Sequence, residues 1–275
     1  MKKFLLVVMS IMMMGLTLVG CGSDTAEKGA GLSGAVSTNG STSMEKVIGI
    51  LSEKFMGDNK GVTITYDATG SGTGIEAVSK GSTDIGLSSR ALKDSEKAKG
   101  LKETTVALDG IAIIVNENSP INDLKTEDVA ALFNGQVTDW SKLGGKAGQV
   151  AAIGREAGSG TRDGFESITD TEDKCKYRQE CTSTGDVITA VSSNPNAIGY
   201  ASLASVKDSV KAVSVDGVTP SEATVKDGSY AVQRPFVLVT KKDSKLSGNA
   251  QKFFDYITSE AANEVISGAG VVPAN

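Results

Sequence analysis

The pattern of hydrophobic and polar positions changes repeatedly between the period of a helix and that of a strand. Apolar residues stand at helical spacing over 44–55, whereas GVTITYDATG (61–70) alternates as a strand does. The same criteria predict strands within 33–40, 83–90, 110–120, 149–154 and 230–240, and helices within 70–81, 125–135, 159–168, 219–225 and 250–266. The segment 184–203 reads as a helix followed by a short strand. Alternating strands and helices predict an α/β fold with mainly parallel pairing.

Two of the predicted strands are continuously apolar, which indicates burial on both faces. They lie at 110–115 and 235–240 and bracket the middle of the chain. We interpret them as crossings between two lobes. Lobe 1 would comprise 33–113 plus 236–275, and lobe 2 would comprise 114–235. A single continuous sheet is the alternative.

The chain begins with MKKFLLVVMSIMMMGLTLVGC, in which Lys2 and Lys3 precede an apolar run that is short for a membrane span. This pattern predicts an export signal over residues 1–20. The ending LTLVGC resembles the lipobox of bacterial lipoproteins, which implies that Cys21 is acylated and anchors the protein at the extracytoplasmic face of the cell membrane. Residues 21–32 would form a flexible tether. The alternative is an ordinary secretion signal in which Cys21 is incidental.

The charge and the composition exclude several classes of function. The 28 basic and 33 acidic residues give a formal net charge of −5, and loss of Lys2 and Lys3 leaves 26 against 33, or −7. Nucleic acid is therefore not an expected partner. The chain contains no histidine, which excludes Ser-His-Asp and Cys-His catalysis and histidine-ligated metal sites. Cys175 and Cys181 form either a disulfide or two free thiols.

Four loops share one chemistry, because all are rich in Ser, Thr and Gly and several carry Arg at an edge. They are NGSTS (39–43), TGSGTG (69–74), LSSR (87–90) and REAGSGTR (155–162). In an α/β sheet such loops lie at the carboxyl ends of strands, next to helix N-termini. Backbone N–H groups, hydroxyls and close-approach glycines at that place make an anion site. Each loop alone is equally compatible with ordinary helix capping.

The loops differ from the known nucleotide-binding sequences. None ends in the Gly-Lys-Ser/Thr of a P-loop, and TGSGTG lacks both the full dinucleotide fingerprint and an acidic residue about 20 positions later. They therefore indicate a cage for a small oxyanion.

The sequences of these loops and of the residues around them resemble a known family. GSTSM, GSGTG followed by DIGLSSR, and REAGSGTRDGF are similar in order and spacing to the phosphate-binding proteins of bacterial ABC importers. The resemblance covers essentially the whole mature chain, and R-x-x-G-S-G-T and RPF are its most specific parts. It implies a two-lobed type II periplasmic-binding-protein fold of the α/β class, which closes on phosphate in the cleft between the lobes.

The resemblance also implies ligand-binding residues. The phosphate ligands that it implies are Thr42, Ser43, Ser71, Arg155, Ser159, Gly160 and Thr161. Ser89 and Arg90 are further candidates, at a place where the chain departs from the family. The planar guanidinium of Arg155 suits a tetrahedral oxyanion, although a surface ion pair with Glu156 or Asp163 is the alternative for this residue.

One position departs from the family. Many members carry an Asp where this chain has Ser89, and that Asp accepts the proton of hydrogen phosphate. The discrimination between phosphate and sulfate therefore stays open. Glu156 could take the acceptor role. Arg90 would add positive charge to the site or would form a surface ion pair.

These observations predict a monomeric receptor that binds inorganic phosphate and delivers it to ABC permease subunits and their ATPase. No cofactor, metal or catalytic residue is predicted. The alternatives are a receptor for sulfate, molybdate or tungstate, a surface sensor, and an extracytoplasmic phosphatase. The phosphatase is disfavoured because no serine has a base beside it in the sequence and no metal-ligand motif occurs.

Overall fold

The computed structural model describes residues 32–274, so the predicted signal sequence and Cys21 lie outside the described residues. Most of the described strands form one hydrogen-bonded sheet. They are β1 (Ser33–Gly40), β2 (Gly61–Ala68), β3 (Ile85–Ser88), β4 (Leu101–Asn116), β6 (Ala151–Arg155), β7 (Gln179–Cys181), β8 (Ala197–Ser202), β9 (Val210–Ala212), β11 (Gln233–Lys241) and β12 (Val272–Pro273). β5 (Asp123–Leu124) and β10 (Ser214–Val215) pair separately.

The helices alternate with these strands along the chain. They are α1 (Glu45–Asp58), α2 (Ser71–Lys80), α3 (Asp94–Lys97), α4 (Thr126–Phe133), α5 (Gly160–Ile168), α6 (Thr184–Ser192), α7 (Glu222–Lys226), α8 (Gly248–Ile257) and α9 (Asn263–Gly268). Short 3₁₀ turns are η1 (Thr42–Met44), η2 (Trp140–Leu143), η3 (Leu203–Ser205) and η4 (Glu260–Ala262). Within residues 32–274 no helix has both the length and the apolar character that a membrane crossing requires.

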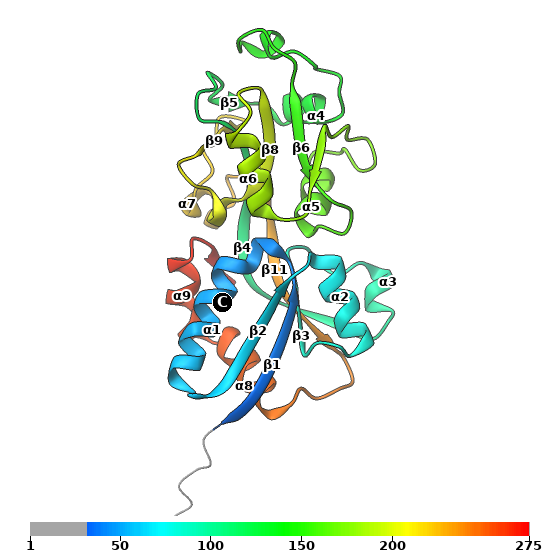
Figure 1. Ribbon diagram of the computed structural model, residues 1–275, viewed down its shortest axis with the longest axis vertical. Helices are drawn as coiled ribbons and strands as arrows, with labels where there is room; N and C mark the ends of the chain where they lie inside the picture. Colours follow the sequence, from blue (N-terminus) through cyan, green and yellow to red (C-terminus); the bar gives the residue numbers. More distant parts are fainter. Residues whose placement is uncertain (1–31, 275) are drawn as a thin grey trace, which may run out of the picture. The chain divides into compact units, whose positions relative to one another are not determined.

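The strand order in the sheet is β2-β1-β3-β11-β4-β8-β6-β7. Pairing is parallel among β2, β1 and β3 and among β8, β6 and β7, but β11 pairs antiparallel with both β3 and β4, and β4 pairs antiparallel with β8. The expectation of mainly parallel pairing was therefore wrong. The physical reason is that β4 and β11 run in opposite directions through the middle of the molecule (Figure 1).

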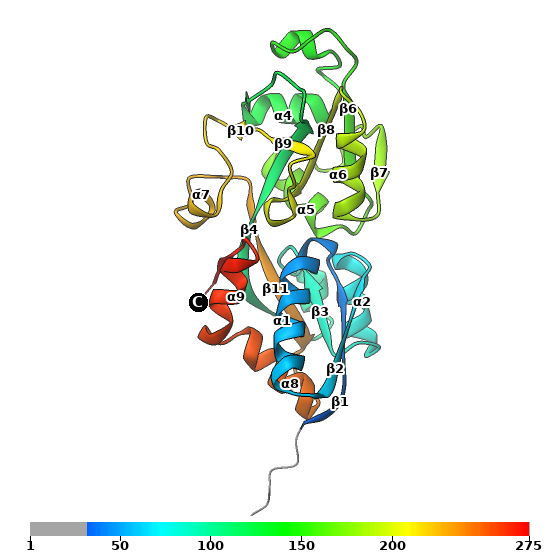
Figure 2. The same cartoon turned by 60° about the vertical axis from the view of Figure 1, so that its left-hand side comes forward.

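The hydrophobic core divides at the middle of β4. Ala107 packs in one core with Val36, Ile48 and Phe236, whereas Ile111 packs in a second core with Phe165 and Tyr200. We call the parts around these cores lobe 1 and lobe 2; Figures 1 and 2 show β4 and β11 passing between them. The hydrogen-bonded strand order continues through β4 even though the core does not.

The local patterns explain how each lobe buries its residues. In α1 the buried positions Val47, Ile48, Leu51 and Phe55 lie on one face, which packs beside α8 and α9 on one side of the lobe 1 sheet (Figure 2). Lobe 2 covers both faces of its sheet: Ala152 in β6 belongs to the core that includes α4 and α5, and its neighbours in β6 belong to the core that includes α6. Ile111–Val115 are fully buried, as a continuous apolar run requires.

Candidate functional site

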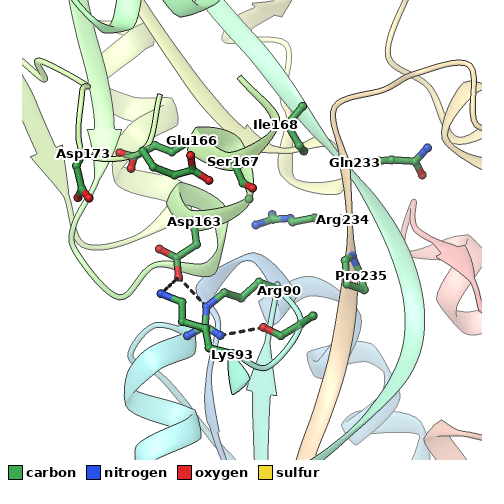
Figure 3. Close-up of a pocket in the computed structure, with 13 residues that line it drawn as sticks. Arg90, Lys93, Asp163, Glu166, Ser167, Ile168, Asp173, Gln233, Arg234 and Pro235 are labelled. Atoms are coloured by element: carbon green, nitrogen blue, oxygen red, sulfur yellow. Dashed lines mark hydrogen bonds and ion pairs between the residues drawn. The ribbon is translucent and has the colours of Figure 1, made fainter. Parts of the chain in front are cut away.

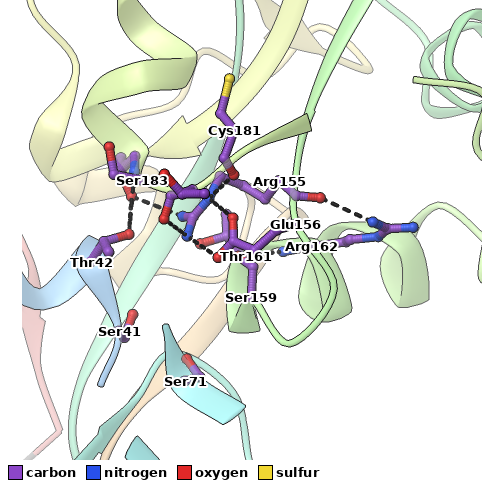
Figure 4. Close-up of polar contacts among 12 residues, drawn as sticks. Ser41, Thr42, Ser71, Arg155, Glu156, Ser159, Thr161, Arg162, Cys181 and Ser183 are labelled. Carbon is purple, nitrogen blue, oxygen red and sulfur yellow. Dashed lines mark hydrogen bonds and ion pairs between the residues drawn. The ribbon is translucent and has the colours of Figure 1, made fainter. Parts of the chain in front are cut away.

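Side chains from both lobes meet where several helices begin. Ser43 Oγ in η1 lies 2.8 Å from Thr161 Oγ1 in α5, although the two residues are 118 positions apart in the chain. At the start of α2, Ser71 Oγ lies 3.3 Å from Ser89 Oγ, which follows β3. The predicted serine and threonine ligands are each no more than 4% exposed: Thr42, Ser43, Ser71, Ser89, Ser159 and Thr161. We call these residues, together with Gly160 and Arg155, the anion cluster. Figure 4 labels five of its members: Thr42, Ser71, Arg155, Ser159 and Thr161.

Glycines let the two lobes approach each other at this place. A Cβ atom on Gly160 would lie 2.5 Å from Ser71 Oγ and 2.7 Å from Ser89 Oγ, which is closer than real Cβ contacts. Close by, the backbone N–H of Gly72 in lobe 1 donates to the carbonyl of Gly158 in lobe 2 at 2.9 Å. Gly160, at the start of α5, therefore lies directly against the hydroxyls of Ser71 and Ser89, with no room for a side chain between them.

The start of α5 is built as a helix N-terminus. Ser159 is its N-cap and its hydroxyl accepts from the backbone N–H of Arg162. The first N–H groups of a helix have no partner within the helix and carry partial positive charge. Gly160 and Thr161 are the first two residues of α5, so their backbone N–H groups are donors of this kind.

The guanidinium of Arg155, at the end of β6, is buried and fully engaged. Its Nε and Nη2 donate to the carboxylate of Glu156 at 3.0 and 2.8 Å, and the same nitrogens also donate to the carbonyls of Cys181 and Thr182. Its Nη1 donates to Thr184 Oγ1 at 3.3 Å. The fork therefore holds Glu156 with one side, and with Nη1 it reaches the hydroxyl of Thr184, which in turn contacts Thr42 and Ser43.

Both backbone groups of Arg155 are held by side chains. The hydroxyl of Tyr200 accepts from Arg155 N–H at 3.1 Å, and Arg162 Nη1 donates to the Arg155 carbonyl at 3.0 Å. Burial raises the pKa of Tyr200 above its ordinary value, so its phenol keeps its proton. Tyr200 also lies 3.1 Å from Tyr177 Oη, and Tyr177 donates to Glu166. This network lies within lobe 2 and holds the end of β6 in place.

Thr184, the first residue of α6, contacts the anion cluster and is not among the ligands that the sequence predicts. Its Oγ1 lies 3.1 Å from both Thr42 Oγ1 and Ser43 Oγ in lobe 1, and it is only 3% exposed. The sequence TSTGD (182–186) does carry the same Ser, Thr and Gly pattern before a helix as the four loops that were identified. This pattern by itself is equally typical of an ordinary helix start.

The structure does not bring Arg90 into the anion cluster. Its Nη1 and Nη2 each lie 2.8 Å from the carboxylate of Glu96, and its Nε lies 2.7 Å from Asp163 Oδ2 in α5 of lobe 2. Burial by itself would lower the pKa of Arg90, but Glu96 and Asp163 outweigh it and raise that pKa. The ion-pair alternative considered for Arg90 is the arrangement that the structure has.

Two cavities lie along the contact between the lobes. One of about 620 Å³ touches the anion cluster at Thr42 and also reaches Thr184. The other, of about 500 Å³, is lined by charged residues of both signs, among them Arg90, Asp163 and Arg234 (Figure 3). Because its lining shares no residue with the cluster, the second cavity is not the place where the predicted ligands converge.

Comparison with known proteins gives the family. The model of the PBP superfamily domain matches residues 25–261. A phosphate-binding protein PstS of Bacillus subtilis (strain 168) is 32% identical over 264 residues, which cover 91% of this chain and 84% of the relative. The chain belongs to the PBP superfamily, among the PstS-like phosphate-binding proteins. A PstS of Borreliella burgdorferi is 27% identical and covers 98% of both chains.

Solved structures of this superfamily share the fold. A putative phosphate ABC transporter substrate-binding protein from Clostridium perfringens, with bound phosphate, is 36% identical with a TM-score of 0.85 and covers 88% of this chain and all of its own. An ABC-type phosphate transport receptor from Vibrio cholerae is 31% identical with a TM-score of 0.72 and covers 87% of this chain and all of its own. The predicted two-lobed α/β fold is thereby confirmed.

Within residues 32–274 of this PBP superfamily chain, Cys175 and Cys181 are free thiols, so the disulfide considered between them is not formed. Cys181 packs in the core with Ala151 and Ile153, whereas Cys175 packs against the core that contains Ala152. Successive residues of β6 point to opposite faces of the sheet, so the two sulfur atoms lie on different faces. Among the described residues, no group of three or more Asp, Glu and Cys side chains is arranged to hold a metal ion.

Proposed function

We propose that this protein is an extracytoplasmic receptor that binds inorganic phosphate between its lobes and delivers it to an ABC permease. The observation that carries the proposal is the contact of Ser43 in lobe 1 with Thr161 in lobe 2, inside a buried cluster that also contains an arginine. Phosphate-binding relatives that match over most of this chain support the same function.

The cluster offers what a tetrahedral oxyanion needs. It combines hydroxyl donors, the N-terminal residues of α2 and α5, and Nη1 of Arg155. The hydroxyls contact one another, and hydrogen bonds between neutral groups are about half as strong as those in which one partner is charged. An oxyanion placed among them would replace neutral contacts with charge-assisted ones, which favours binding.

Donors from both lobes also link binding to closure. Thr42, Ser43, Ser71 and Ser89 belong to lobe 1, whereas Arg155, Ser159, Gly160 and Thr161 belong to lobe 2. A ligand that contacts both sets stabilises the closed arrangement relative to an open one. We propose 33–113 plus 236–275 and 114–235 as the two bodies that move, with the boundary in β4 shifted toward its start because Ile111 and Ile113 pack in the lobe 2 core.

The experiment that tests this function is titration calorimetry of the purified protein with phosphate, arsenate, sulfate and molybdate. We expect phosphate to bind, and Arg155→Ala to weaken binding strongly while the protein stays folded. Arg178→Ala is the matched control, because Arg178 is an exposed arginine of the same lobe outside the cluster. A protein that ignores phosphate and binds sulfate or molybdate instead would contradict the assignment.

Sulfate belongs in this comparison for a structural reason. The family resemblance sets Ser89 where many members carry an Asp that accepts the proton of hydrogen phosphate. Both carboxylate oxygens of Glu156 accept hydrogen bonds from Arg155, so this side chain is already engaged. The ratio of the phosphate and sulfate affinities therefore measures how well the site selects the protonated anion when Ser89 stands in place of a carboxylate.

The attachment to the membrane is part of the same proposal. We infer that Cys21 is the acylated residue of a lipoprotein and that the monomeric receptor domain is tethered beside its permease. Fractionation of cells that produce Cys21→Ala tests this inference, since the variant should leave the membrane fraction. A phosphatase assay with a chromogenic ester and divalent metals tests the enzymatic alternative, and we expect no turnover.

A further inference from the structure

We propose that Thr184 is an additional ligand-binding residue and that the start of α6 forms a further wall of the phosphate site. This inference rests on the proposed function and extends the ligand set to a helix outside the four identified loops. Thr184 contacts the anion cluster from lobe 2, on the side where Thr42 and Thr184 both border the cavity of about 620 Å³.

The hydroxyl of Thr184 is shared by three groups. Thr42 Oγ1 and Ser43 Oγ each lie 3.1 Å away in lobe 1, and Arg155 Nη1 donates to it at 3.3 Å. In addition, the backbone N–H of Thr184 donates to Thr42 Oγ1 at 3.2 Å. Thr184 is therefore in contact with Thr42, Ser43 and Arg155, each of which is a predicted phosphate ligand.

Counting protons shows that these groups have donors to spare. A hydroxyl has one proton and two lone pairs, and the guanidinium has donors only. Arg155 uses one lone pair of Thr184, and the hydroxyls of Thr42, Ser43 and Thr184 together have three protons to direct. An anionic oxygen accepts several hydrogen bonds at once, so all these donors can turn toward it without competing for one another's lone pairs.

The local structure explains why this residue can serve a ligand and not the helix. Ser183 performs the capping, because its hydroxyl accepts from the backbone N–H of Asp186. The Thr184 side chain is thus not required as the cap and points into the contact between the lobes. Its backbone N–H belongs to the first turn of α6, where it has no partner within the helix.

The test compares Thr184→Ser with Thr184→Ala by phosphate calorimetry. Both variants lose the methyl group, so any loss of packing is common to them and only the hydroxyl differs. We expect the Ser variant to bind phosphate within about threefold of the wild type and the Ala variant to bind about 10-fold or more weakly, the range for a hydrogen bond to a charged group. Thr189→Ala is the matched control, because Thr189 lies on α6, borders the same cavity and is exposed.

The outcomes separate this inference from the proposed function. Equal phosphate affinities for the Ser and Ala variants, with normal binding by the wild type, would overturn the role of Thr184 alone. A wild-type protein that does not bind phosphate would overturn the proposed function itself. The melting temperatures of the ligand-free Ser and Ala variants should agree. If the Ala variant is instead destabilised enough to account for its whole loss of phosphate affinity, Thr184 has a purely structural role.

Discussion

Asp109 in β4 and Arg234 in β11 face each other across the two strands that pass between the lobes. Arg234 Nη2 lies 3.0 Å from Asp109 Oδ2, and neither residue is more than 4% exposed. Ser202 in β8 donates to the other carboxylate oxygen at 2.9 Å, and Arg234 Nη1 lies 3.5 Å from the carbonyl of Ser89. A buried ion pair thus connects the crossing strands to one loop of the anion cluster.

Removing one member of this pair should destabilise the fold strongly. In Asp109→Asn the guanidinium of Arg234 would stay buried without a charged partner, and we expect a loss of about 3–5 kcal/mol in the free energy of unfolding. Urea denaturation measures it. Glu76→Gln is the control, because it breaks only the exposed contact with Lys80 and should leave stability nearly unchanged. Equal stabilities for the two variants would show that the buried pair contributes nothing.

The phenol of Tyr200 should matter for both stability and ligand binding. Tyr200→Phe leaves the buried N–H of Arg155 without its acceptor, which we expect to cost about 1–3 kcal/mol in the free energy of unfolding and to weaken phosphate binding. Tyr256→Phe is a matched control, since the hydroxyl of Tyr256 is buried and has no hydrogen-bond partner among the described residues. If both variants unfold at the same denaturant concentration, the clamp on Arg155 has no energetic role.

Gly160 should not tolerate even a methyl group without damage to the site. In Gly160→Ala the new Cβ would press on the hydroxyls of Ser71 and Ser89, so phosphate affinity should fall at least about 10-fold while the circular dichroism spectrum stays unchanged. Gly248→Ala places the same methyl group at the first position of α8, where no heavy atom lies within 4 Å. The second variant should bind phosphate normally, and normal binding by the first would contradict the predicted convergence.

The ion pair of Arg90 with Asp163 should help to hold the lobes closed. Asp163 in lobe 2 lies 2.7 Å from Arg90 Nε and 3.2 Å from Lys93 Nζ, both of lobe 1, and its side chain is 27% exposed. Because the carboxylate is partly solvated, we expect Asp163→Asn to accelerate phosphate release only about two- to fivefold, with the effect fading at high salt. Stopped-flow release kinetics measure it. Asp170→Asn is the control, since it affects only an exposed pair within lobe 2.

The Arg90–Glu96 pair should make stability depend on pH. Burial opposes the shift, but Arg90 and the backbone N–H of Lys93 outweigh it and hold the pKa of Glu96 below its ordinary 4.5. The pair therefore stabilises the fold fully when the pH is above the ordinary pKa of 4.5. Its contribution is lost as the pH falls through the lowered pKa of Glu96. The melting temperatures of wild type and Glu96→Gln should differ near neutral pH and converge on acidification. A constant difference at every pH would contradict this assignment.

Several features of the fold were predictable because they depend on local chemistry. The spacing of apolar residues predicted α1 and the buried run of β4. The Ser, Thr and Gly loops predicted where helices begin. Strand direction was not predictable in the same way. β11 pairs antiparallel with β3 because it brings the chain back from lobe 2 into lobe 1. No short sequence pattern shows that the chain returns in this direction.

The candidate site divides in the same manner. The types of residue that form the anion cluster are visible in the sequence, because hydroxyls and glycines before a helix are the groups that bind anions. The assignment of Arg90 depended on its partners. Glu96 lies nearby in the chain, but Asp163 is in the other lobe, and only packing brings it within reach of Arg90. Thr184 was missed for the same reason, because its contacts with Thr42 and Ser43 lie across the two lobes.

The amino-acid sequence by itself carried the local features of this protein: an α/β alternation, no histidine, and a repeated set of Ser, Thr and Gly loops before helices. The tertiary structure alone decided which of those groups meet. Helical and strand periods act over a few residues, so they can be read locally, whereas a buried charge chooses its partner from whatever the fold places beside it. Arg155 and Arg90 each pair with a carboxylate that is close in the chain, Glu156 and Glu96. Only the packing of the lobes decides that Arg155 also reaches Thr184 in the contact between the lobes, whereas Arg90 reaches Asp163.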